Sequence, residues 1–411
     1  MKKKLLALLL CVALVAAVAC VLVACTDDDA IVVWVGEGTK ELTEQQIAKF
    51  NKNNEWGIEI KAKVEEVSES KAVGDAASKP KSAADIFCFA QDQLARAVRS
   101  NLLAPLTNSA IAAIEENCDD GSVEASKIGG TIRAFPMTAD NGYFMYYDKR
   151  VITDDVDITS LEALIAACEA AGKNFSMNLT EDGGGWYAAS FFYATGCKSE
   201  WTTDENGNFT EYEDTFKSDA GLTALKGMKL LINSDCYHSS DKVADFTAGI
   251  SSAVVVSGIW DYNAAKKALG SNLGMAALPA FTVDGQSYTL QSYLGHKLMG
   301  IKPQEDPYKA LDLQRLAMYL TSEECQLERF NKVGWVPSIE SLQEGENKVT
   351  SDAMDILLNA KTVLQGQYPS NWWNKMEAMT VGAKTASTDA ALQGLLNTYS
   401  SALPALKVEK D

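Results

Sequence analysis

The sequence predicts an α/β fold divided into two lobes, each a mostly parallel β-sheet flanked by helices. The first observation is that short apolar runs, typical of buried strands, alternate with amphipathic stretches at helical spacing, the order that builds parallel sheets. The second is length, because 411 residues exceed what one hydrophobic core usually serves. The third is that no repeat or low-complexity linker separates two halves. The chain is therefore expected to cross between the lobes more than once.

The predicted elements of the first part of the chain alternate between strand and helix. Apolar runs bounded by glycine or polar residues indicate strands, and apolar residues three and four apart indicate helices. The segment 65–83 is polar and rich in Ala and Ser, and its sequence does not distinguish between a loop and a helix. Strands are expected at 31–35, 58–62 and 84–89, and helices at 41–53 and over a stretch that ends at Ser100.

The same alternation continues to the C-terminus. Residues 159–172 begin with a threonine cap, carry apolar residues at helical spacing and end at a glycine, which predicts a helix. Asn206-Gly207 lies between Trp201 and Phe209 and is a signal for a β-hairpin turn. Further helices are expected at 219–233, 307–321 and 389–403, and a strand at 253–256.

The first 24 residues predict export. Three lysines at positions 2–4 precede an uncharged apolar run over 5–24, the pattern of a secretory signal. The ending at 22–25, Leu-Val-Ala-Cys, resembles the lipobox of bacterial lipoproteins, which implies cleavage before Cys25 and a lipid on its sulfur. Residues 25–30 then form a polar tether. The alternative is an uncleaved anchor helix, since about 20 apolar residues can span a bilayer; both readings place the protein outside the cytoplasm.

Charge and composition exclude several classes of function. Lys and Arg total 37 against 55 Asp and Glu, a net charge of −18. Nucleic-acid binders and basic membrane-surface proteins need clustered Lys and Arg, so neither is expected. With only two histidines, His238 and His296, neither a His-rich metal site nor a histidine general base is expected. We predict no metal and no cofactor.

The motif search gives little support for catalysis. The sequence has no GxSxG, P-loop, GxGxxG or HExxH motif. Paired carboxylates would suit a glycosidase, but 55 acidic residues form such pairs by chance. Six cysteines follow Cys25 without a CxxC pair, and buried free thiols are favoured over the disulfides that an exported protein permits. These six are Cys88, Cys118, Cys168, Cys197, Cys236 and Cys325.

Tryptophans at the edges of predicted loops give the strongest functional signal. Core aromatics usually lie inside elements among apolar neighbours, whereas an aromatic at a loop edge can offer a flat platform. Sugar rings present C–H faces to such platforms, while their hydroxyls need polar partners. The alternative is that each tryptophan caps the core of its own lobe. The residues concerned are Trp186, Trp260, Trp335, Trp372 and Trp373.

From about residue 31 to 403 the chain resembles the bacterial extracellular solute-binding proteins of the maltose/maltodextrin-binding group. The resemblance rests on short segments in family order at family-like spacing. It implies a two-lobed periplasmic-binding-protein fold of type II with a ligand cleft between the lobes. The implied first lobe is 31–138 plus 290–340, and the second is 139–289 plus 341–411. The segments are 84–92, 102–106, 134–137, 146–149, 205–207, 218–222, 257–260, 278–281, 321–324 and 334–337.

The resemblance also implies a set of sugar-contacting residues. Phe89 stands where the family often has tryptophan, Gln93 replaces an arginine, and Asp140 replaces a glutamate one methylene longer. Gly183 stands at a position that is aromatic in the maltose binder, so maltose itself is doubtful. Trp372 and Trp373 compete for one platform position. The implied ligand-binding residues are Glu37, Lys40, Phe89, Asp92, Asp140, Glu181, Trp186, Trp260, Trp372 and Trp373.

The function that follows from the resemblance is transport rather than catalysis. A monomeric lipoprotein on the cell membrane would capture a maltodextrin-like oligosaccharide by closing its lobes and deliver it to the permease of an ABC importer. One alternative is the same fold with a non-sugar solute. Because the predicted cleft is acidic, a cationic ligand or an aminosugar also stays an alternative. The other alternative is a glycosidase.

Overall fold

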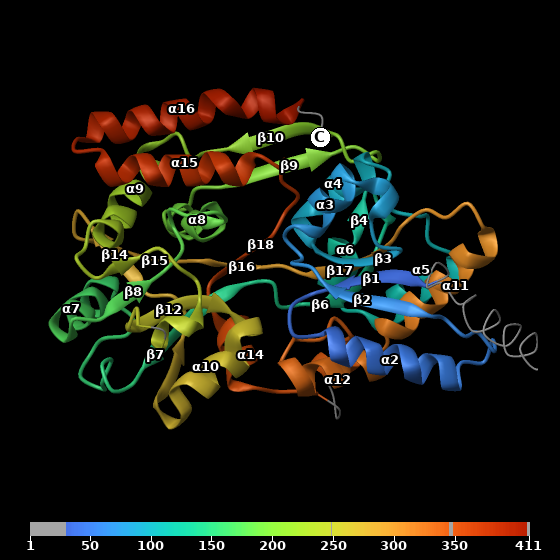
Figure 1. The fold of residues 1–411 in the computed structure, drawn as a ribbon. Helices are drawn as coiled ribbons and strands as arrows, with labels where there is room; N and C mark the ends of the chain where they lie inside the picture. Colours follow the sequence, from blue (N-terminus) through green and yellow to red (C-terminus); the bar gives the residue numbers. More distant parts are fainter. Residues whose placement is uncertain (1–29, 248, 345–347, 409–411) are drawn as a thin grey trace, which may run out of the picture.

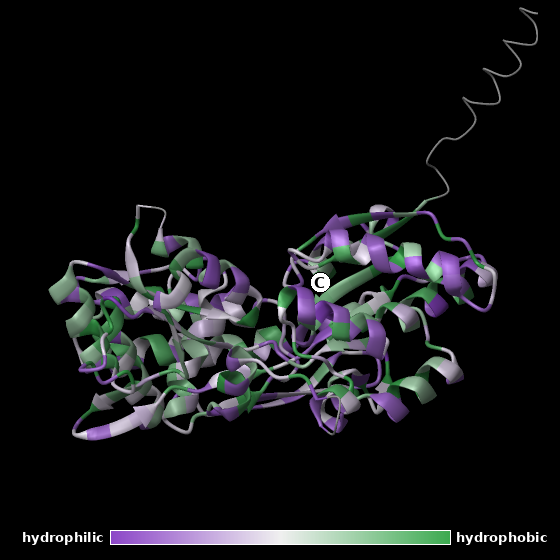
Figure 2. Cartoon of the chain, turned by 90° about the horizontal axis from the view of Figure 1, so that it is seen from below, coloured by the Kyte–Doolittle hydropathy of each residue, from purple (hydrophilic) through white to green (hydrophobic). Residues whose placement is uncertain are grey.

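The computed structural model describes residues 30–247, 249–344 and 348–408 (Figure 1). The predicted signal peptide, Cys25 and the tether as far as residue 29 lie outside the described residues. Within the described ranges, no helix is both long and apolar enough to cross a membrane. Two lobes lie side by side, joined by strands near the middle of the molecule (Figures 1 and 2).

The sheet of the first lobe has the strand order β2-β1-β3-β17-β6. β1 pairs in parallel with β2 and β3, whereas β17 is antiparallel to both β3 and β6. Every residue of the two central strands β3 and β17 is buried, which matches their unbroken apolar character. The strands are β1 (Ile31–Val35), β2 (Ala62–Glu66), β3 (Ile86–Ala90), β6 (Phe135–Thr138) and β17 (Lys297–Ile301).

The sheet of the second lobe has the order β11-β8-β12-β7-β13. β8 pairs in parallel with β11 and β12, and β7 is antiparallel to β12 and β13. β12 is fully buried along its length and lies at the centre. The strands are β7 (Tyr143–Asp148), β8 (Asn174–Ser176), β11 (Tyr237–His238), β12 (Ser252–Gly258) and β13 (Leu273–Ala276).

The two-lobed α/β fold is confirmed, but the expectation of mostly parallel sheets is wrong. Each sheet combines two parallel with two antiparallel pairings. The antiparallel pairings involve β6, β7 and β17, which flank the places where the chain passes between lobes. A strand that enters from the other lobe runs against its neighbours, because no helical crossover within the lobe turns it back.

Helices surround each sheet (Figure 1). Those of the first lobe are α2 (Lys40–Asn53), α3 (Ala72–Ser78), α4 (Leu94–Arg99), α5 (Asn108–Asn117), α6 (Asp120–Ala125), α11 (Pro307–Leu320), α12 (Glu323–Val333) and α13 (Glu340–Gln343). Those of the second lobe are α7 (Leu161–Ala171), α8 (Gly184–Ala194), α9 (Asp219–Ile232), α10 (Tyr262–Leu269), α14 (Asp352–Asn359), α15 (Trp372–Thr385) and α16 (Asp389–Lys407). Short 3-10 turns are η2 (Pro80–Ser82), η3 (Gln91–Gln93), η4 (Val243–Phe246), η5 (Ile259–Asp261) and η6 (Gly270–Asn272).

Small strand pairs complete the fold. The hairpin β9 (Ser199–Thr203) and β10 (Phe209–Asp214) extends from the second lobe towards α4, with the predicted Asn206-Gly207 turn at its tip (Figure 1). The other pairs are β4 (Lys127–Ile128) with β5 (Thr131–Ile132), β14 (Ala280–Val283) with β15 (Gln286–Thr289), and the parallel pair β16 (Ser292–Leu294) with β18 (Thr362–Leu364).

The chain passes between the lobes more than once. It does so between β6 and β7, between β16 and β17, and between α13 and α14. The first passage runs close to β16: a Cβ on Gly142 would collide with the backbone carbonyl of Tyr293. A glycine at position 142 therefore allows two connecting segments to lie in direct contact.

The predicted strand at 58–62 is misplaced, because β2 begins only at Ala62. The Asn51 side chain explains the difference. Its amide nitrogen donates to the Ile60 carbonyl, and its amide oxygen accepts from the Ile60 N–H, both at 2.9 Å. These bonds satisfy the backbone of Ile60 outside a sheet. In the undecided segment 65–83 the structure forms α3 and η2.

The six cysteines that follow Cys25 are free and buried, as predicted. Three of them, Cys88, Cys168 and Cys325, lie on β3, α7 and α12, where a thiol packs as a small apolar group.

Candidate functional site

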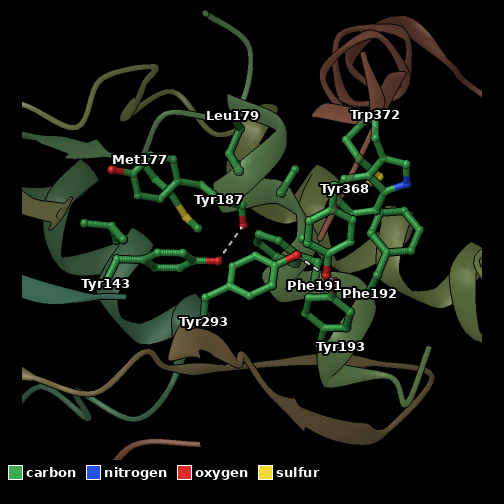
Figure 3. Packing of buried hydrophobic residues seen from close by; sticks show 14 of the residues in the cluster. Tyr143, Met177, Leu179, Tyr187, Phe191, Phe192, Tyr193, Tyr293, Tyr368 and Trp372 are labelled. Atoms are coloured by element: carbon green, nitrogen blue, oxygen red, sulfur yellow. Dashed lines mark hydrogen bonds between the residues drawn. The ribbon is translucent and has the colours of Figure 1, made fainter. Parts of the chain in front are cut away.

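Tyr293 of β16 lies in a buried aromatic cluster with Tyr143, Tyr193 and Tyr368 (Figure 3). Its ring lies parallel to that of Trp186, with centroids 6.1 Å apart and planes 5° apart. Its hydroxyl and that of Tyr193 are 2.6 Å apart, and Tyr193 is also within 3.2 Å of the Tyr368 hydroxyl. All three hydroxyls therefore have partners, which lets a buried aromatic cluster stay rigid.

Trp186 lies in the first turn of α8, placed there by the glycines before it. Gly183 takes the left-handed conformation (φ 84°) that ends the loop, and a Cβ on Gly185 would clash with the Trp373 carbonyl. The close approach that Gly185 permits brings α8 against α15. The Trp186 ring is 4.6 Å from that of Tyr143. Its Nε1 is buried and has no hydrogen-bond partner among the described residues, so a donor is available there.

Trp260 follows β12 on η5, and its ring centroid is 6.1 Å from that of Trp186. The Lys297 ammonium lies 5.3 Å from the centre of the Trp260 ring and 4.1 Å from that of Trp335. Trp335 itself is only 2% exposed and belongs to the core of the first lobe. Trp186 and Trp260 thus form a continuous indole surface on the second lobe, with a cation at its edge.

Asp140, predicted as a ligand contact, is fully buried and bound by the protein itself. One carboxylate oxygen accepts from the Thr138 hydroxyl at 2.6 Å and from the Lys297 ammonium at 3.2 Å. The other accepts from the backbone N–H of Val336 at 2.9 Å. Both oxygens are therefore occupied, and Asp140 balances the charge of Lys297.

Of the two competing tryptophans, Trp373 has the partly exposed ring. Its Nε1 donates to Asp92 Oδ2 at 2.9 Å, across the boundary between the lobes. Trp372 is fully buried and donates to the Tyr399 hydroxyl at 2.9 Å. Burial raises the pKa of Asp92 to about 6, although the hydrogen bond from Trp373 opposes the shift.

The structure places Phe89 in the core of the first lobe. It is fully buried on β3, and its ring centroid lies 5.5 Å from that of Phe87. Side chains on both faces of this strand are covered, so Phe89 offers no platform in this conformation.

The remaining predicted residues are exposed and lie at the margin. Glu37 follows β1 and is near enough to Asp261 of the second lobe for its charge to raise the pKa of that carboxyl. Lys40 begins α2, and its charge acts on Glu65 beside it. Glu181 lies in the loop before α8, where its charge acts on Glu377. Glu37 therefore belongs with the interlobe residues, whereas the charge of Lys40 acts on Glu65 within the first lobe.

Three charged residues of this region were not predicted from the sequence: Glu69, Asp261 and Lys297. Burial raises the pKa of Glu69, and the nearby Lys297 charge opposes that rise. Asp261 accepts from the Ser257 hydroxyl at 2.7 Å, and burial raises its pKa to about 6. The position of Asp261 beside Trp260 was a usable signal. No sequence pattern in segment 65–83, for which loop and helix both stayed open, singled out Glu69 as a residue of the site.

The described part of the chain contains no cluster of three His, Cys, Asp or Glu side chains that would hold a metal ion. What the arrangement offers is hydrogen bonding and stacking. The second lobe contributes the indoles of Trp186, Trp260 and Trp373, and the first contributes the carboxyl groups of Glu69 and Asp92.

A family model described as bacterial extracellular solute-binding protein matches residues 45–355, which is most of the chain. The chain belongs to this family. Its described body is therefore extracytoplasmic. No curated protein matches this solute-binding protein in sequence.

Solved structures share the architecture of this solute-binding protein. One described as a complex with acarbose is 26% identical, with a TM-score of 0.77 over 92% of this chain and 99% of its own. The maltodextrin-binding protein MalE1 from L. casei BL23 is 20% identical, with a TM-score of 0.74 over 92% and 99%. The GacH receptor of Streptomyces glaucescens is 19% identical, with a TM-score of 0.74 over 93% and 99%. These similarities confirm the two-lobed fold.

Proposed function

We propose that this solute-binding protein captures a maltodextrin-like oligosaccharide between its lobes and delivers it to the permease of an ABC importer. The observation that carries the proposal is the set of three indoles, Trp186, Trp260 and Trp373, of which Trp186 and Trp260 lie against each other and Trp373 donates to the Asp92 carboxylate of the first lobe. The structures it resembles support the choice of ligand, since their descriptions name acarbose and maltodextrin.

The chemistry of the site suits a sugar. Indole faces cover the C–H faces of pyranose rings, and carboxylates accept hydrogen bonds from hydroxyls. The unpartnered Nε1 of Trp186 adds a donor for a ring or hydroxyl oxygen. Leaving that donor buried and unpaired costs about 1–3 kcal/mol, so a ligand oxygen that accepts from it regains part of that cost.

Closure of the lobes couples binding to delivery. The indoles belong to the second lobe and Asp92 and Glu69 to the first, so a ligand that touches both favours the arrangement in which the lobes are together. The permease then distinguishes loaded from empty protein by that arrangement. No bond of the ligand is made or broken, and the protein acts as a monomeric binding component rather than an enzyme.

A cationic sugar is the second candidate ligand. Asp92 and Asp261 accept hydrogen bonds from an indole and a hydroxyl, and no ion pair to either is found among the described residues. A ligand amine would supply the missing positive charge. An aminosugar or an amine-bearing pseudo-oligosaccharide therefore fits the same site.

The membrane anchor is part of the proposal. The Leu-Val-Ala-Cys ending implies a lipid on Cys25, which would hold the exported protein at the membrane near its permease. Metabolic labelling with a fatty acid checks this: the label should enter the native protein and be absent from Cys25→Ala.

The ligand is tested by tryptophan fluorescence of the purified protein, titrated with maltose, longer maltodextrins, other disaccharides, glucosamine and spermidine. We expect a saturable change with an oligosaccharide that Trp260→Ala abolishes. Trp56→Ala is the matched control, because Trp56 is 42% exposed beside α2 and α11 and lies under Arg315. A response to spermidine alone would reject a sugar ligand, and release of reducing ends would show a glycosidase.

A further inference from the structure

We propose that Lys297 is a positioning residue of this site, whose buried ammonium fixes the Trp260 platform of the second lobe against the first. The inference rests on the proposed function, because it assigns Lys297 a role in the affinity for the ligand. Lys297 was not among the residues suggested by sequence, and it makes no direct ligand contact in this proposal.

The geometry around Lys297 joins both lobes. Lys297 is the first residue of β17 and is 3% exposed. Its ammonium lies 3.2 Å from Asp140 Oδ1, 4.1 Å from the centre of the Trp335 ring and 5.3 Å from that of Trp260. Trp335 belongs to the first lobe, whereas Trp260 follows the central strand of the second. One cation therefore contacts an indole from each lobe.

A buried ammonium needs compensation, and its partners here are fixed. Asp140 supplies the opposite charge, and its carboxylate is held by Thr138 and by the backbone of Val336. The rings of Trp335 and Trp260 also lie close to the ammonium, and aromatic rings attract cations most strongly where water is excluded. Lys297 cannot move without breaking the ion pair, so the Trp260 ring is attracted to a fixed point.

Lys297 preorganises the Trp260 ring for ligand binding. A half-buried indole without this partner samples other rotamers, and a ligand would have to restrict it on binding. With Lys297 in place, the ring is already oriented for stacking when the ligand arrives. Lys297 therefore acts on affinity through Trp260.

The test compares Lys297→Met with the paired variant Lys297→Met/Asp140→Asn. The paired variant removes both charges of the ion pair together, so Asp140 is not left as an unpaired buried carboxylate, and it is the variant expected to fold. Lys302→Met is the matched control: Lys302 follows the same strand, donates to the Ala83 carbonyl at 2.7 Å and lies away from the indoles. Maltotriose affinity should fall about tenfold in both Lys297 variants and by less than about twofold in Lys302→Met.

A double-mutant cycle separates positioning from general structural support. In a Trp260→Ala background, Lys297→Met should change the maltotriose affinity by less than about twofold, because its effect passes through the missing ring. A further tenfold loss in that background would overturn the proposal. So would an unchanged affinity in the paired variant with a wild-type Trp260.

A readout without ligand tests the positioning of Trp260 separately from the proposed function. Removing the Lys297 charge should increase acrylamide quenching of tryptophan emission, and the increase should vanish in a Trp260→Phe background. If the wild-type protein binds no sugar but shows this pattern, the proposed function fails and the positioning of Trp260 stands. If the wild-type protein binds maltotriose but quenching is the same with and without Lys297, the proposed function stands and this inference fails.

Discussion

The indole Nε1 of Trp373 donates a 2.9 Å hydrogen bond to Asp92 Oδ2, and the two residues come from different lobes. The segment before Trp373 strengthens this junction: the Gln367 side chain accepts from the Ala95 N–H and donates to the Gln91 carbonyl, both at 2.9 Å. Hydrogen bonds therefore hold the turn that contains Asp92 against the segment that precedes α15. Any change of charge at Asp92 acts on a contact between the lobes.

The first prediction concerns the protonation of Asp92. Its pKa is about 6 in the folded protein because of burial, against about 4 for an unperturbed aspartate. Between these values the folded protein holds a proton that the unfolded chain has lost. The contribution of Asp92 to the free energy of unfolding therefore falls as the pH rises from about 4 to about 6, and stays low above that. Asp92→Asn should thus stabilise the protein at pH 7.5 more than at pH 4.

Urea denaturation of both proteins at the two pH values measures this difference. Comparing the wild type with Asp92→Asn at each pH cancels the titration of the other acids. A stabilisation that is larger at pH 4 than at pH 7.5 would contradict the assignment. The same variant should also bind maltotriose more weakly, since it loses a carboxylate acceptor.

The second prediction concerns the tip of the β9–β10 hairpin. Gly207 has φ 79°, and a Cβ there would collide with the Ala95 carbonyl of the first lobe. Arg133 donates to the neighbouring Glu205 carbonyl at 3.0 Å, so the tip is held against that lobe. Gly207→Ala should lower the free energy of unfolding by about 1–3 kcal/mol beyond the conformational cost of a positive φ.

Gly285 is the matched control for Gly207. It turns the β14–β15 hairpin with φ 80°, and its added Cβ would meet nothing within 4 Å. Gly285→Ala should therefore show the conformational cost alone. Hydrogen exchange of residues 199–214 should quicken in Gly207→Ala and stay unchanged in Gly285→Ala. Equal losses of stability in the two variants would mean that the collision with the Ala95 carbonyl adds nothing to the loss in Gly207→Ala.

The third prediction concerns Arg329, which is 1% exposed on α12. Its Nη2 donates to the Leu320 carbonyl at 2.8 Å, but its Nε and Nη1 have no hydrogen-bond partner among the described residues. Burial lowers the pKa of this guanidinium, which shows that the charged form is disfavoured there. Arg329→Met keeps the volume and removes the charge, so it should raise the free energy of unfolding by about 1 kcal/mol.

Chemical denaturation checks this value, with Arg329→Ala for comparison. The alanine variant removes the same charge but leaves a cavity, so it should be less stable than the methionine variant by about 2 kcal/mol or more. A methionine variant less stable than the wild type would show that the single bond to Leu320 outweighs the burial of the charge.

Periodicity was enough to predict most helices, because they are amphipathic over a length that no strand matches. Helices α2, α9 and α11 begin and end within a residue or so of the predicted limits. Strand limits were harder, because a side chain can satisfy the backbone in place of a neighbouring strand, as Asn51 does for Ile60. Strand direction was also missed, since it depends on which lobe the chain arrives from.

The places of the indoles at loop edges, after glycines or beside other turn residues, could be predicted from the sequence. Which of them lie together in the fold could not. Trp186, Trp260 and Trp373 come together, whereas Trp335 and Trp372 are buried. Sequence cannot separate these two groups, because all five follow or adjoin turn residues. Lys297 could not be predicted because a lysine is expected at the surface. Only the fold shows that Lys297 is buried and forms an ion pair with Asp140.

The last prediction concerns Cys236, which differs from the other buried thiols. Hydrogen bonds from the Cys168 thiol and the Ser234 hydroxyl lower the pKa of Cys236 to about 7, although burial acts in the opposite direction. Burial raises the pKa of Cys88, Cys118, Cys197 and Cys325 instead. The thiolate is the reactive form, so at pH 7.5 Cys236 has a far larger reactive fraction.

Access to Cys236 also favours reaction. It is 4% exposed but directly precedes β11, a two-residue strand at the edge of its sheet, where local opening costs least. Iodoacetamide followed by peptide mass spectrometry should therefore label Cys236 first, with a rate that rises through about pH 7. Cys168→Ala removes the donor thiol and should slow the labelling at pH 7, while Cys197→Ala, in the same lobe, should not. Earlier labelling of Cys88 or Cys325 would show that opening of the first lobe, rather than thiol acidity, controls reactivity.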